Sequence, residues 1–143
     1  MNKYSAMLAI WVMLFSVPVL ANELISKSPK DAKVYFINLK NGQTVNETFK
    51  VQFGLEGMGV APAGTSIEHT GHHHLLINVD ASTIDFKRSL PATEQIKHFG
   101  KGQTETVLTL PKGKHTLQLL LGNYLHIPHD RPVMSEKITV IVK

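Results

Sequence analysis

The segment TFKVQFGLEG, residues 48–57, alternates apolar and polar side chains along its length. Its apolar members are Phe49, Val51, Phe53 and Leu55. A period of two is the pattern of a β-strand that buries one face and exposes the other. The Gly- and Pro-rich stretch of residues 57–71 has no periodicity, which predicts a loop after this strand.

Similar short segments recur along the chain, and none shows a helical period over a dozen positions. They are VYFI (34–37), HHLLINVD (73–80), TETVLTL (104–110), KHTLQLLL (114–121) and KITVIVK (137–143). Turn residues such as Asn41-Gly42 and Pro111-Lys112-Gly113 separate them. Six or seven short strands predict an all-β fold, a single immunoglobulin-like antiparallel β-sandwich, with a small barrel as the alternative.

The N-terminus has the pattern of a secretory signal peptide. Lys3 precedes the apolar run of residues 7–20, and Val19 and Ala21 occupy the −3 and −1 positions of a cleavage site. The run is shorter than the ~20 residues that a membrane-spanning helix needs. We therefore expect a cleaved signal peptide over residues 1–21 and one exported domain over residues 22–143, without a membrane span; a retained anchor is the alternative.

The composition limits the chemistry. The chain has no cysteine, which excludes disulfides, thiolate zinc sites, iron–sulfur clusters and a cysteine nucleophile. The formal net charge of the chain is +4. The lysines are dispersed along the sequence rather than gathered into a stripe, so nothing indicates nucleic-acid binding. Any metal site must use His, Met, carboxylate, amide or backbone ligands.

Histidines are the main candidates for function. Three connections are longer than a sandwich requires, namely residues 56–72, 81–103 and 123–136, and long loops are often functional. Seven of the eight histidines lie in these loops or at their boundary, and His115 alone lies well inside a predicted strand. In the 73–80 strand, alternation puts His73 on the apolar side and His72 and His74 together on the other.

Two imidazoles that are two residues apart on a strand can present themselves to one ion. The candidate metal ligands are His72, His74, His126 and His129, together with His98 and the loop methionines Met58 and Met134. His69 is a weaker candidate. His and Met without Cys suit copper, and zinc is the alternative.

Two functions of a different class are also compatible with these histidines. One is a structural or interaction domain whose histidines form a hydrogen-bond network. The other, less favoured, is a metal-dependent enzyme. Nucleophilic hydrolysis is disfavoured, because no G-x-S-x-G elbow surrounds any serine.

Five blocks of the sequence resemble a known family. FGLEGMGVAPAG, TGHHHLLIN, IKHFGKGQTE, LPKGKHTLQLLLGN and HIPHDRPVMSEKITVIVK are similar to the signature of the bacterial family called domain of unknown function 4399. The resemblance runs from about Lys33 to Lys143 and includes every candidate ligand except His69. It implies an exported bacterial protein, periplasmic in a Gram-negative cell, and implies no activity.

Together these patterns predict a small periplasmic binding domain that coordinates a transition metal, copper favoured over zinc, as a carrier or sensor module. Its partner would be the metal ion itself or an unknown periplasmic protein, and the sequence leaves the oligomeric state open.

Overall fold

The computed structural model describes residues 24–143, so the predicted signal peptide and its alternative, a retained anchor, lie outside the described residues. The smaller of two sheets has the strand order β1 (Lys33–Phe36), β3 (Thr48–Glu56) and β7 (Glu105–Thr109). The larger sheet has the order β2 (Gln43–Val45), β9 (Ile138–Val142), β8 (Gly113–Gly122), β5 (Thr70–Ile77) and β4 (Gly59–Val60), and β6 (Ile96–His98) also pairs with β5. A short 3-10 helix covers Ala81–Thr83.

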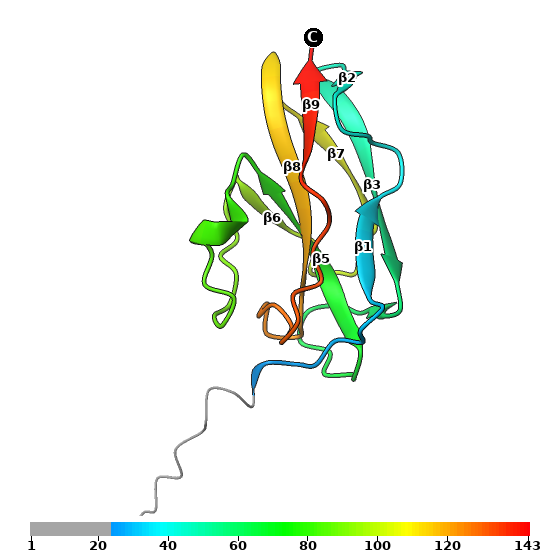
Figure 1. The fold of residues 1–143 in the computed structure, drawn as a ribbon, viewed down its shortest axis with the longest axis vertical. Coiled ribbons are helices and arrows are strands. Elements are labelled where there is room, and N and C mark those ends of the chain that lie inside the picture. Colours follow the sequence, from blue (N-terminus) through cyan, green and yellow to red (C-terminus); the bar gives the residue numbers. More distant parts are fainter. Residues whose placement is uncertain (1–23) are drawn as a thin grey trace, which may run out of the picture.

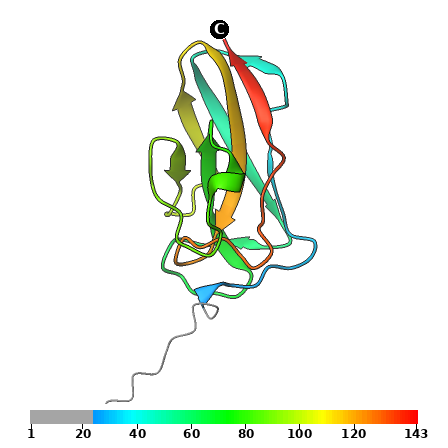
Figure 2. The ribbon, with the colours of Figure 1, turned by 60° about the vertical axis from the view of Figure 1, so that its left-hand side comes forward.

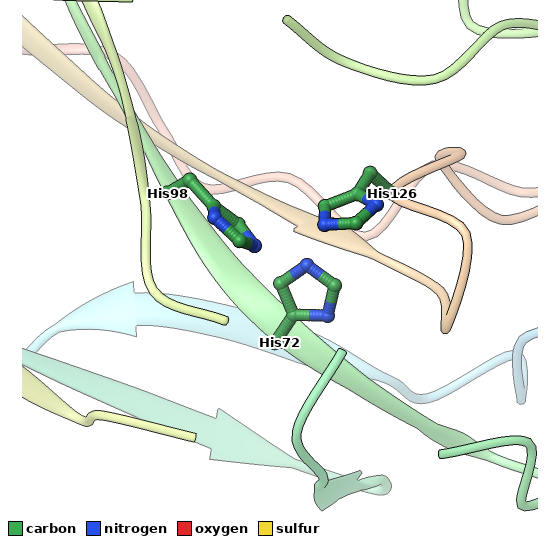
Figure 3. A group of neighbouring side chains, drawn as sticks. All are labelled: His72, His98 and His126. Atoms are coloured by element: carbon green, nitrogen blue, oxygen red, sulfur yellow. The ribbon is translucent and has the colours of Figure 1, made fainter. Parts of the chain in front are cut away.

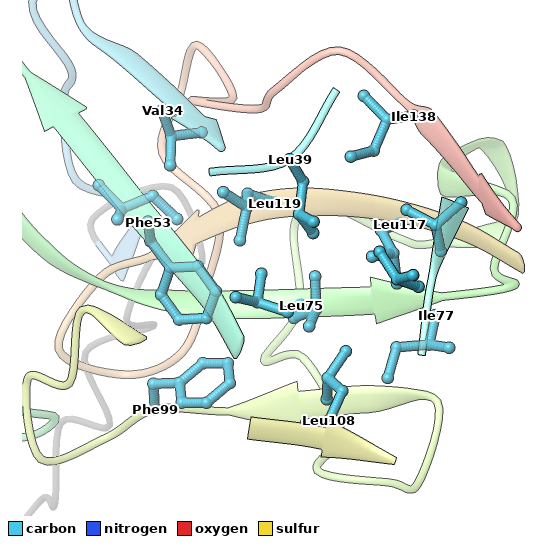
Figure 4. Packing of buried hydrophobic residues seen from close by; sticks show 14 of the residues in the cluster. Val34, Leu39, Phe53, Leu75, Ile77, Phe99, Leu108, Leu117, Leu119 and Ile138 are labelled. Atoms are coloured by element: carbon cyan, nitrogen blue, oxygen red, sulfur yellow. The ribbon is translucent and has the colours of Figure 1, made fainter. Parts of the chain in front are cut away.

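The two sheets pack face to face around one apolar core (Figures 1 and 4). The smaller sheet contributes Val51 and Phe53 of β3, which the alternation of residues 48–57 predicted to be buried. The larger sheet contributes the alternate residues Leu75 and Ile77 of β5, with Leu117, Leu119 and Leu121 of β8. The prediction of an all-β sandwich is therefore confirmed.

The pairing is mostly antiparallel, but two short contacts are parallel: β2 with β9 and β4 with β5. The larger sheet is thus mixed, whereas the smaller sheet is wholly antiparallel. The finer assignment to the immunoglobulin type stays a prediction.

The predicted histidine-bearing loops are shorter than expected. Strand β5 begins at Thr70, so His72, His73 and His74 all lie within it, and His98 is the last residue of β6. The sequence did not reveal this because pairing with neighbouring strands, not local alternation, extends β5 and creates β4 and β6. Only His69, His126 and His129 lie in loops.

Strand β5 is buried on both faces. Its inner face meets the main core, and its outer face carries Leu76, which packs in a second small cluster with Leu90, Ile96 and Leu120. The segment that follows β5 covers this outer face and includes the 3-10 helix (Figure 2). This cover explains why the outward-facing residues of β5 are as buried as the inward-facing ones. Among the described residues, no helix is long and apolar enough to cross a membrane.

Candidate metal centre

The three consecutive histidines of β5 point to opposite faces of the sheet. The His73 ring lies on the core side, 5.2 Å from the ring of Phe53. The rings of His72 and His74 lie on the outer side, with centroids 4.8 Å apart. Alternation along a strand accounts for this separation, as the sequence predicted. All three side chains are fully buried.

Strand β6 brings a further imidazole to the same place. It runs antiparallel to β5 with His98 directly opposite His74, and opposed residues in such a pair project from the same face of the sheet. The His98 ring lies 5.0 Å from that of His72 and 5.2 Å from that of His74. The chain thus turns back after β5 to place His98 beside the pair.

The loop after β8 supplies His126. Its ring lies 4.9 Å from that of His72 and 4.5 Å from that of His98. The backbone of His126 has a φ of 66°, a left-handed conformation that costs a non-glycine residue about 1–2 kcal/mol. Strain of this kind persists only where the surroundings impose it.

Hydrogen bonds from several segments impose this conformation. The His126 N–H donates to Asn123 O at 2.8 Å, and Leu90 N–H donates to His126 O at 2.9 Å. Asn123 is 1% exposed, and its side-chain oxygen accepts from the N–H groups of Leu125 and Ile127. Its amide donates to Leu24 O and Ser26 Oγ. The Asn123 side chain therefore fixes the loop that carries His126 through its oxygen and ties it to the N-terminal segment through its amide nitrogen.

The imidazoles of His72, His98 and His126 form the tightest group. One ring nitrogen of each lies within 4.8 Å of the others (Figure 3). His72 is buried, whereas His98 and His126 are half-buried, so the group has one closed side and one side toward solvent. His74 lies beside this group, but its ring is 6.1 Å from that of His126. We call the four residues His72, His74, His98 and His126 the histidine cluster.

Two glycines make room for the rings. A Cβ on Gly122 would lie 2.6 Å from Cε1 of His74, and a Cβ on Gly100 would overlap the ring of His98. Gly122 is the register partner of His72 on β8, so the space that its side chain would occupy above the sheet is left to imidazoles. Any larger residue at either position must displace a ring.

The nitrogens of the cluster lack hydrogen-bond partners within the described chain. Both ring nitrogens of His72 and of His74, and Nε2 of His98, are buried without one. By contrast, His115 is fully satisfied: Asn78 Nδ2 lies 2.9 Å from its Nδ1, and its Nε2 lies 2.8 Å from Pro111 O. A hydrogen-bonded network would pair the cluster as His115 is paired, because an unpaired buried polar atom costs about 1–3 kcal/mol. Both ring nitrogens of His73 and Nδ1 of His129 also lack partners, so the close approach of the rings is what distinguishes the cluster.

Three members of the cluster, His72, His74 and His98, have lowered pKa values, which favour their neutral forms. Burial, followed by the neighbouring His126 and His98, lowers the pKa of His72 from 6.5 to about 4. Burial, followed by His72, lowers the pKa of His74 to about 3, and burial also lowers the pKa of His98. A neutral imidazole with a free nitrogen is the form that binds a metal ion.

The remaining candidate ligands lie elsewhere. His129 is 2% exposed and its Nε2 lies 3.2 Å from Thr70 O, outside the close group. Met58 packs against the main core. Met134 is on the surface, where it lines a groove of about 570 Å³ beside β1. His69 is exposed next to Glu68. The structure therefore brings together His72, His74, His98 and His126 and leaves out both methionines and His129.

The donor atoms of the cluster, imidazole nitrogens, are suitable ligands for a metal ion. Metal–imidazole bonds are ~2.0–2.1 Å long, which sets tetrahedral ligand nitrogens about 3.3 Å apart, so small ring rotations would close the three imidazoles on an ion. Sequence reasoning overlooked Gly100, Gly122 and Asn123, which position the rings. The signal was available in part: Gly122-Asn123 ends the long apolar strand just before HIPHD.

Fold and cluster together define an all-β domain that carries buried, unpartnered imidazoles on the outer face of its larger sheet. The chain belongs to the family described as Domain of unknown function (DUF4399), whose model matches residues 51–143. No curated protein matches the chain.

One solved structure is similar in part, the endo-beta-1,4-mannanase from Thermotoga petrophila, at 18% identity and a TM-score of 0.44. The likeness covers 80% of this chain but only 20% of the mannanase chain.

Proposed function

We propose that this protein is a small periplasmic domain that binds one transition-metal ion at the histidine cluster and acts as a metal carrier or sensor. The observation that supports this most directly is the approach of three ring nitrogens, from His72, His98 and His126, to within 4.8 Å of one another. Three separate segments supply them, and the backbone of His126 accepts strain to do so. An ion would give one ring nitrogen of each of these three imidazoles a partner.

We propose copper over zinc as the ion. The sequence argument for copper used His together with Met58 and Met134, and these methionines lie outside the cluster. The preference now rests on the imidazoles alone, since Cu(II) binds nitrogen ligands more tightly than Zn(II) does in the Irving–Williams order. The export of the domain rests on the signal-peptide pattern of residues 1–21.

Two matched variants test the proposal. His126 and His69 both have positive φ, at 66° and 55°, and Asn tolerates this conformation better than most residues. His126→Asn removes an imidazole of the cluster, and His69→Asn makes the same change at an exposed histidine outside it. Isothermal titration with Cu(II) and Zn(II), supported by metal analysis, should give one ion per chain for the wild type and for His69→Asn.

For His126→Asn we expect an affinity lower by tenfold or more, with an unchanged circular dichroism spectrum. Failure of the wild-type chain to bind either ion stoichiometrically with at least micromolar affinity would overturn the proposal. An unchanged affinity in His126→Asn would place the ion outside the histidine cluster.

A further inference from the structure

The histidine cluster contains no carboxylate. In the described part of the chain, the charged groups that act on His72, His74 and His98 are other histidines. Three acids lie four residues from a cluster histidine; one of them, Glu94, is exposed and lines a different groove, beside His115. Glu68 is beside the exposed His69, and Asp130 Oδ1 accepts from the N–H groups of Ser28 and Arg131.

A divalent ion at such a site would keep its whole charge, because neutral imidazoles donate electron pairs without adding negative charge. His72 and His74 are fully buried, and an uncompensated charge next to buried surface is costly. One anionic ligand would reduce the net charge of the centre from two units to one.

Three imidazole ligands would also leave the ion one coordination position for that ligand. Three imidazoles approach one another closely, and the fourth, His74, lies farther from His126 and is fully buried. The half-buried rings of His98 and His126 stand on the solvent side of the group. Three protein ligands with one accessible position is the arrangement of metal centres that take a water molecule or substrate as the fourth ligand.

We infer that a divalent ion held by His72, His98 and His126 takes a small anion from solution as its fourth ligand. The inference rests on the proposed metal binding and adds to it the chemical class of the ligand: a monodentate anion such as hydroxide, chloride, azide or a carboxylate. Binding is a ligand exchange in which the anion replaces a water molecule on the ion, with no change in oxidation state.

Azide is the probe. The Cu(II)-loaded chain is titrated with sodium azide and followed by its azide-to-copper charge-transfer absorbance and by electron paramagnetic resonance. We expect saturation at one azide per ion. By mass action, azide at ~100 times its dissociation constant should raise the apparent copper affinity about 100-fold. His69→Asn, which changes an exposed histidine outside the cluster, should respond as the wild type does.

The outcomes separate the two ideas. Tight Cu(II) binding with four nitrogen ligands and no response to azide would overturn the inference and leave the proposed function intact, since His74 would then close the site. Absence of copper binding would overturn both. Copper mixed with His126→Asn under the same conditions serves as the control and should give no saturable azide band.

Discussion

His74 of β5 lies directly opposite His98 of β6 in an antiparallel register, with ring centroids 5.2 Å apart. This pairing makes β6, a strand of only three residues, the element that completes the histidine cluster. The place of β6 depends on its pairing with β5 and on the burial of Ile96 beside Leu76. His129, which lies outside the cluster, serves as a comparison for the contribution of His98.

Replacing His98 with Ala should lower Cu(II) affinity by tenfold or more and change stability little, because His98 is half-buried and its Nε2 has no hydrogen-bond partner. His129→Ala should do the reverse. It empties a site that is 2% exposed and removes the contact to Thr70 O, at a cost of about 1–3 kcal/mol in unfolding free energy. Copper titration would measure the affinity of both variants, and urea denaturation would measure their stability. A stability loss confined to His98→Ala with an affinity loss confined to His129→Ala would contradict the prediction.

Gly100→Ala should weaken metal binding through His98. A Cβ at this position would overlap the His98 ring, and the ring can escape only by turning away from its neighbours. Changes to residues that orient metal ligands typically cost about 10–100-fold in affinity. Gly59→Ala is the matched control, because the nearest atom to its Cβ is Thr70 Cγ2 at 3.4 Å, an ordinary contact. Copper titration should show a loss for Gly100→Ala alone.

Part of this site could be predicted from the sequence. The period of two separates His73 from His72 and His74, because side chains on a strand alternate. His98 was a candidate ligand, but its position opposite His74 could not be predicted, since three residues show no period and the register with β5 is long-range. The choice between His126 and His129 could not be predicted either. It depends on the hydrogen bonds with Asn123 and Leu90 that hold the loop of His126 in place. The methionines were predicted as ligands from their place in loops, but Met58 packs against the core.

Asn123 should position His126 without contacting the ion. Asn123→Ala removes both acceptor contacts to Leu125 and Ile127, so we expect lower stability, by about 1–3 kcal/mol, and lower copper affinity. Asn38→Ala removes comparable bonds to the backbone of Lys50 and Gln52 far from the cluster. Asn38→Ala should therefore lower stability and leave copper affinity unchanged. Equal copper affinities for the two variants would rule out a positioning role for Asn123.

Metal addition should stabilise the fold. A ligand that binds only the folded chain at ~100 times its dissociation constant adds ~2.7 kcal/mol. For a domain of this size that is a rise in melting temperature of roughly 10 °C. Thermal unfolding with and without Cu(II) should show the rise in the wild type, and a chelator should reverse it. In His126→Asn the rise should shrink to a small fraction, whereas a full rise would mean that the ion stabilises another site.

Acid should destabilise the protein, and His73 should carry a separable share of this effect. Burial lowers the pKa of His73 from 6.5 to about 4, so the unfolded chain binds more protons than the folded one between these values. Stability is therefore complete above pH 6.5 and falls as the pH drops toward 4. The shift is equivalent to about 3 kcal/mol.

His73→Phe keeps a ring beside Phe53, which itself packs against Phe99, and removes the titrating group. Urea denaturation at about pH 7 and about pH 4.5 should show that the wild type loses about 2–3 kcal/mol more than the variant does. The comparison concerns the difference between the two pH values, so any packing cost of the larger ring cancels. Equal losses would show that His73 is not buried in its neutral form.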